Sequence, residues 1–197
     1  MKIGRLIVRV VIGGLMFGHG VQKWFGWFGG PGIEGASGMM HSLGLRPGRR
    51  NAVAASASEA IGGALLLAGF LTPAAATVLI ATQLTAIRKV HFQNGVWITG
   101  GGYEYNLVLI AAMLALVDDG PGKPSLDDAF GIRASGPAWT AASLAAAVVG
   151  STLAIEAGSR QGELSSEVVG ETAIPGTSPA AAETDGQAPT TETPATS

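Results

Sequence analysis

The chain has 197 residues, of which 47% are hydrophobic and 13% charged, and its net charge is −2. Soluble globular domains carry about 25% charged residues, so the composition indicates a membrane protein, and a negative chain without a basic stripe excludes a nucleic-acid partner. The absence of cysteine excludes disulfides, thiolate-held iron–sulfur clusters and thioether-attached haem. A redox role would therefore need a bound organic carrier, a site of histidine and carboxylate groups, or a partner subunit.

The first predicted membrane span covers residues 3–21 and reads as an uncleaved signal anchor, because no small-residue cleavage site follows it. Gly14-x-x-x-Gly18 within it either permits close approach of a neighbouring helix or reflects the tolerance of glycine in membrane helices. Spacings of three and four residues place three polar side chains on one face at its far end: His19, Gln22 and Lys23. The aromatic residues of 24–28 suit a helix that leaves lipid at the headgroup level.

Residues 29–51 form a long loop, which we expect to contain a short helix in the membrane interface. The second and third spans, residues 52–70 and 73–91, are separated by a tight turn, in which Thr72 can cap the third span, and should form an antiparallel hairpin. Small residues recur every fourth position in the second span, which favours tight helix packing, and Glu59 lies in its first half. The third span becomes polar toward its end at His91, and we expect Lys89 to reach the headgroups there.

A fourth, shorter span over residues 103–117 opens with Glu104, a carboxylate that suits the first turn of a helix. A polar loop follows, and residues 137–157 form a fifth apolar segment that we expect to span the membrane and pack peripherally. Residues 158–197 are rich in Ala, Thr, Pro, Glu and Ser without periodicity, so we predict a disordered acidic tail.

These motifs together resemble the DoxX family of small bacterial membrane proteins over about residues 5–130. The motifs that carry the resemblance include His19-Gly-x-Gln-Lys-Trp-Phe-Gly, Ser58-Glu-x-x-Gly-Gly63 and Gly101-Gly-Tyr-Glu-Tyr105. The resemblance implies an all-α membrane protein with a four-helix transmembrane bundle at residues 1–130. The additional C-terminal transmembrane helix at 131–157 and the disordered Pro/Thr/Ala-rich tail at 158–197 lie outside the family pattern. The family is named for a subunit linked to thiosulfate:quinone oxidoreductase, which implies a quinone-linked membrane subunit and leaves enzymatic activity open.

The order of the spans alone brings six polar groups to the same half of the bilayer, because spans one to four end or begin there. These groups are His19, Gln22, Lys23, Glu59, His91 and Glu104. One interpretation is structural, with buried Lys23–Glu59 and His91–Glu104 pairs that fix helix register. The other is a head-group site for a quinone or similar small ligand, in which a histidine and a carboxylate exchange protons and an apolar groove takes the tail. Metal or haem ligation by His19 and His91 is a third, weaker interpretation, and we predict no metal site.

The predicted setting is the inner (cytoplasmic) membrane of a bacterium, with several passes through the lipid bilayer. The first helix usually sets orientation, which favours an N-terminus inside the cell. The predicted role is a membrane subunit of a quinone-linked oxidoreductase system with a redox-enzyme partner subunit. The alternative is a non-catalytic scaffold that recruits redox or stress-response enzymes.

Overall fold

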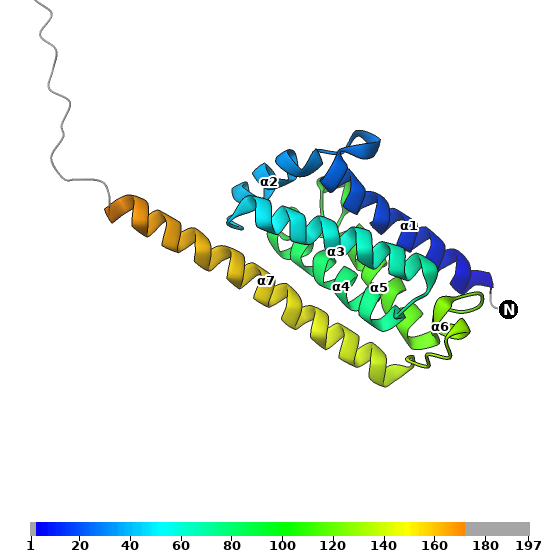
Figure 1. Cartoon of the computed structure of the whole chain (residues 1–197). Helices are drawn as coiled ribbons and strands as arrows, with labels where there is room; N and C mark the ends of the chain where they lie inside the picture. The colour runs from blue at the N-terminus through cyan, green and yellow to red at the C-terminus, as the bar shows by residue number, and fades with distance from the viewer. Residues whose placement is uncertain (1–2, 172–197) are drawn as a thin grey trace, which may run out of the picture.

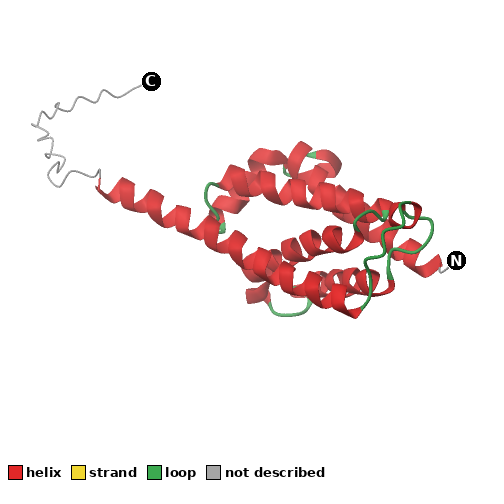
Figure 2. Ribbon diagram, turned by 60° about the horizontal axis from the view of Figure 1, so that its bottom comes forward, coloured by secondary structure: helices red, strands yellow, loops and turns green. Residues whose placement is uncertain are grey.

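The computed structural model describes residues 3–171, with side chains as far as residue 161, and these residues are helical with no strand (Figures 1 and 2). The α-helices are α1 (Ile3–Phe25), α2 (Gly32–Ser42), α3 (Gly48–Ala68), α4 (Thr72–Ala86), α5 (Glu104–Asp119), α6 (Leu126–Ala129) and α7 (Pro137–Glu171). Four short helical turns join them: η1 (Trp27–Gly29), η2 (Ile87–His91), η3 (Phe92–Asn94) and η4 (Ile98–Gly100). The prediction of an all-α protein is confirmed for the described part of the chain.

Three described helices are long and apolar enough to cross a membrane: α1, α3 and residues 137–161 of α7. A membrane-spanning helix needs about 20 residues, whereas α4 has 15 and α5 has 16. The π-helical turn η2 adds five residues to the end of α4. Membrane helices are therefore established, and the complete four-helix bundle with a fifth crossing stays a prediction.

The helices α1 and α3 pack backbone to backbone through glycines. A side chain at Gly20 would overlap the backbone of Ala60, and one at Gly13 or Gly63 would overlap the partner helix in the same way. In contrast, Gly14 and Gly18 have open space where a Cβ would lie. Close helix approach, one of the two interpretations of the Gly14-x-x-x-Gly18 spacing, is not made by these glycines within the chain; Gly13 and Gly20, on the other side of the helix, make the contact with α3.

The turn between α3 and α4 is held by a carboxylate from a distant part of the chain. We expected Thr72 to cap α4, but the cap comes from Asp127 of α6, which accepts hydrogen bonds from the amides of Leu71 (2.7 Å) and Thr72 (3.1 Å). The Thr72 hydroxyl also donates to this carboxylate at 2.7 Å. Arg9, buried in α1, donates to the carbonyl oxygens of Pro121 and Pro124 in the loop before α6. These contacts fix the end of the bundle opposite to the predicted site.

The helix α7 runs along α4 and α5 and then projects beyond the bundle (Figure 1). The predicted end near residue 157 is wrong, since the helix continues to Glu171. No proline occurs between Pro137 and Pro175, and extending an existing helix is far easier than starting one. The carbonyl oxygen of Gly158 accepts a hydrogen bond from the Arg46 amide, which ties α7 to the loop between α2 and α3. The rest of the predicted tail, residues 172–197, lies outside the described residues.

Candidate ligand cavity

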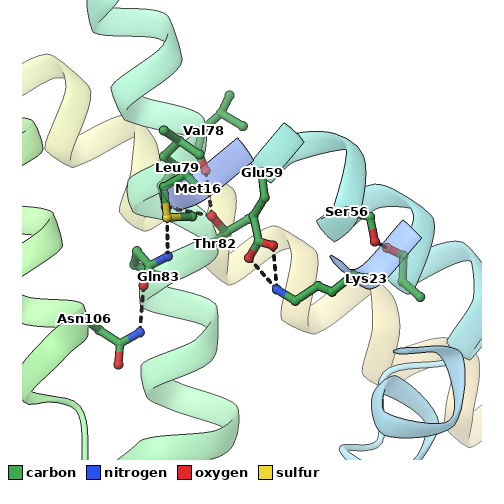
Figure 3. A network of polar contacts seen from close by, with 10 residues as sticks. Met16, Lys23, Ser56, Glu59, Val78, Leu79, Thr82, Gln83 and Asn106 are labelled. Carbon is green, nitrogen blue, oxygen red and sulfur yellow. Dashed lines mark hydrogen bonds and ion pairs between the residues drawn. The ribbon is translucent and has the colours of Figure 1, made fainter. Parts of the chain in front are cut away.

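A buried ion pair joins the end of α1 to the middle of α3. The Lys23 ammonium lies 2.6 Å from each carboxylate oxygen of Glu59, between the two oxygens (Figure 3). The Glu59 side chain is 7% exposed and that of Lys23 is 23% exposed. Charged groups at membrane depth are costly unless they are paired, so each charge here is neutralised by the other. The predicted Lys23–Glu59 pair is present in the structure.

The glycine contact between α1 and α3 sets the position of this pair. Met16, Gly20 and Lys23 follow each other at i, i+4 and i+7 and share the stripe of α1 that faces α3. Gly20 lies against Ala60, the residue next to Glu59. The close approach of the two backbones therefore brings the flexible lysine side chain to the carboxylate.

Lys23 and Glu59 lie on the wall of a cavity of about 290 Å³. The cavity exists because small residues of α3, α4 and α7 line it, among them Ala54, Ala55, Ala81, Gly150 and Ala154. Met39 and Met40 of α2 and Leu43, directly after this helix, also line it. Binding cavities for small molecules are largely apolar with a few placed polar groups, and this cavity has that composition.

Hydroxyl groups line the cavity on the side of α4 and α7. The hydroxyls of Thr82 and Thr85 donate to the helix carbonyls of Leu79 (2.7 Å) and Ala81 (2.8 Å). The Thr85 and Ser151 hydroxyls lie 3.0 Å apart and connect the two helices. Hydroxyls that donate to their own helix keep lone pairs as acceptors, so this side of the cavity can accept hydrogen bonds from a ligand.

Lys89 is a second cation on the cavity wall, and no residue in the described part of the chain pairs with it. It belongs to the π-helical turn η2, a type of turn that is frequent at functional sites. The extra residue of a π-turn rotates the following side chains relative to an α-helix. The sequence suggested that Lys89 reaches the headgroups, whereas the structure places it at the cavity.

The ion pair leaves hydrogen-bonding capacity for a ligand. An ammonium has three N–H donors, and two of them are used by the oxygens of Glu59. Each carboxylate oxygen has a second lone pair in addition to the one that Lys23 occupies. A donor and an acceptor therefore lie side by side at one end of an apolar cavity.

The other four predicted site residues lie elsewhere. The His19 side chain is exposed and has no hydrogen-bond partner among the described residues, since it precedes Gly20 on the helix and faces away from the stripe. Gln22 donates to the carbonyl oxygen of Phe28 at 3.5 Å. His91 and Glu104 do not form the predicted pair. The Nδ1 atom of His91 lies 2.8 Å from the carbonyl oxygen of Gly101.

Glu104 instead accepts a hydrogen bond from the Ile98 amide at 3.0 Å. Both residues thus hold the loop between η2 and α5 in place, and neither lines the cavity. No group of three or more His, Asp or Glu residues within residues 3–161 is arranged to hold a metal ion.

The sequence interpretation did not place Thr82, Thr85 and Lys89 at the candidate site. It also did not assign the helices α2 and α7 to its walls. The three residues are spaced i, i+3 and i+7, a spacing typical of one helical face, so this signal was present. The role of α7 was harder to predict, because an apolar helix at the edge of a bundle carries no mark of what it covers.

Comparison with known proteins agrees with the motifs. The family model DoxX matches residues 4–92 of the chain. A protein of Haemophilus influenzae described as "Uncharacterized protein" is 31% identical over 127 residues, which cover 64% of this chain and 82% of the relative. No solved structure matches the chain. The sequence motifs, the apolar helices and these two matches lead to one conclusion: the chain is a membrane protein of the DoxX family.

Proposed function

We propose that the chain is an integral membrane subunit of a quinone-linked oxidoreductase system and that it binds a quinone at the Lys23–Glu59 pair. The observation that carries the proposal is a buried ion pair on the wall of a largely apolar cavity, between helices suited to a lipid bilayer. The multi-pass arrangement in a bacterial inner membrane belongs to the same proposal.

The chemistry of a quinone suits this arrangement in both redox states. A quinone carbonyl needs a hydrogen-bond donor, which the third N–H of Lys23 provides. A quinol hydroxyl needs an acceptor, which Glu59 and the lone pairs of Thr82 and Thr85 provide. The alanine and glycine wall lets a flat ring lie close to the helix backbones.

Reduction of a quinone takes up two electrons and two protons. The Lys23–Glu59 pair can hold and exchange protons with the bound head group, as general acid–base groups do when they lie within hydrogen-bond distance. The chain has no cysteine for an iron–sulfur cluster or a thiol centre. We therefore assign the electron supply to a redox-enzyme partner subunit.

The test is the quinone content of the purified protein in lipid nanodiscs, measured by extraction and mass spectrometry. The wild type should retain quinone above the level of empty nanodiscs, and Glu59→Gln should lose it. Glu34→Gln is the matched control, because this carboxylate is 84% exposed and lies outside the cavity. Circular dichroism would verify that all three proteins are folded. Equal quinone levels in the wild type and Glu59→Gln would contradict the proposal.

A second candidate is a scaffold that recruits redox or stress-response enzymes. The observation in its favour is the projection of α7 beyond the bundle (Figure 2), which gives a soluble protein a helix to bind. Co-purification separates the two candidates. A stoichiometric soluble partner without retained quinone would support the scaffold.

A further inference from the structure

A second, apolar groove lies between α3 and α4 and borders the cavity. This groove has a volume of about 300 Å³ and shares two wall residues, Ser58 and Val78, with the cavity. Its other walls are entirely apolar: Ala57, Ile61, Gly62, Leu65, Ala74 and Ala75. The groove therefore adjoins the cavity at Ser58 and Val78, and Ser58 is its one polar wall residue.

Small residues line this groove where α3 and α4 pack closely against each other. Gly62 lies against the side chain of Leu79, and a Cβ there would already be within 3.0 Å of it. The groove is not closed toward the outside of the bundle, since Ile61 is 60% exposed and Val78 41% exposed at its edge. In a membrane these exposed side chains contact lipid.

The groove extends along α3 from Ala57 to Leu65. Eight steps of 1.5 Å along the helix correspond to about 12 Å. Cavities for drug-sized ligands have about 300–1,000 Å³, and the cavity alone is at the lower limit of that range. A ligand that uses the whole space must be elongated, with a polar head and a narrow apolar chain.

We infer that the ligand of this cavity carries a single long apolar tail, which lies in the groove and leaves the protein between α3 and α4. The ligand enters sideways from the bilayer along the same path, with its head turned toward Lys23 and Glu59. This inference rests on the proposed function, because it assigns the tail of the ligand whose head group occupies the cavity. Lys89, the unpaired cation on the cavity wall, lies away from the groove.

A tail in this groove exchanges lipid contacts for protein contacts, and lipid tails are as apolar as leucine. The shape of the groove, and not its apolar character, therefore determines which ligand tails can bind. An obstacle in the groove should exclude a ligand with a tail, since tail and obstacle would overlap, and should leave a ligand without a tail unaffected.

The test compares two quinones in nanodiscs: a decyl-substituted benzoquinone and the same benzoquinone without the decyl chain. Ala57→Leu and Ala74→Leu fill the groove and touch no residue of the ion pair. Ala115→Leu is the matched control, because Ala115 is exposed on α5 and lines neither space. The measured quantity is the fraction of occupied sites at each mole fraction of quinone in the bilayer, and the affinity is obtained from this dependence.

Both groove variants should bind the decyl quinone at least tenfold more weakly than the wild type. Their affinity for the tail-less quinone should lie within twofold of the wild-type affinity. Ala115→Leu should bind both quinones with the affinity of the wild type. An equal affinity of the groove variants and the wild type for the decyl quinone would overturn the inference. An equal loss for both quinones would also overturn it, since the substitutions would then act on the head-group site.

If neither quinone binds the wild type, the proposed function fails, and the groove is judged from the amphiphiles that co-purify with the protein. A single-tailed amphiphile that is present with the wild type and with Ala115→Leu but absent with Ala57→Leu would support the tail site. The same set of retained lipids in all three proteins would mean that the groove holds ordinary bilayer chains, and the inference would be wrong.

Discussion

Replacing Lys23 by methionine leaves the Glu59 carboxylate buried without its ammonium partner, and we expect a large loss of stability. The Glu59 side chain is 7% exposed, so little water can take the place of the lysine. Removing one partner of a buried ion pair costs about 3–5 kcal/mol. Lys23→Met should therefore lower the free energy of unfolding by about 3–5 kcal/mol at pH 7.

The reverse substitution should be milder. Glu59→Leu leaves the Lys23 ammonium, whose side chain is 23% exposed and flexible enough to move toward the polar edge of the cavity. We expect a loss of about 1–3 kcal/mol. The double variant Lys23→Met/Glu59→Leu removes both charges and should lie within about 1 kcal/mol of the wild type, because buried ion pairs are commonly replaced by apolar residues without loss.

The assay is unfolding by sodium dodecyl sulfate in mixed micelles, followed by the fluorescence of the four tryptophans. Arg160→Gln is the control: its pair with Glu156 has side chains 76% and 52% exposed, and exposed pairs are worth about 0–1 kcal/mol. The reasoning is refuted if Lys23→Met is as stable as the wild type at pH 7, or if the double variant is as unstable as Lys23→Met.

Other contacts give further predictions. Gly20→Val should prevent stable packing of α1 on α3, because its side chain would overlap a backbone, whereas Gly14→Val should be tolerated in open space; gel filtration and unfolding in detergent compare the two. Asp127→Asn should cost about 2–3 kcal/mol, since it weakens three hydrogen bonds at the start of α4 to a charged acceptor. Asp128→Asn, at an exposed pair, should cost less than about 1 kcal/mol in the same unfolding experiment. Glu104→Gln should accelerate hydrogen exchange of the Ile98 amide, which donates to this carboxylate, without changing quinone retention. Unchanged exchange of that amide would contradict the role of Glu104 in holding the loop.

The Lys23–Glu59 pair could be predicted because opposite charges on antiparallel neighbours at one depth of a membrane have few other partners. The same reasoning failed for His91 and Glu104, which bond to backbone groups of the loop between η2 and α5. Side-chain charges can be matched from a sequence, whereas the free carbonyls and amides of an irregular loop cannot be located before the loop is folded. A shared depth in the membrane was therefore a correct but incomplete criterion.

His19 and Lys89 were misplaced by the geometry of single helices. A spacing of four residues leaves an angle of about 40° on a helix, and this angle was enough to take His19 off the stripe that faces α3. Lys89 lines the cavity together with Thr82 and Thr85, so the helical spacing of these three residues was a better guide than the tendency of a lysine near a helix end to reach the headgroups.

One wall of the cavity comes from α7, whereas the family match ends at residue 92. The charged pair thus lies inside the part of the chain that the family model matches, and the α7 wall lies outside it. Changes at Gly150, Ser151 and Ala154 can alter the width of the chamber without disturbing Lys23 or Glu59. Selectivity between head groups of different size should consequently be adjustable from the seventh helix alone, and exchanging that helix between homologous chains would transfer the preference.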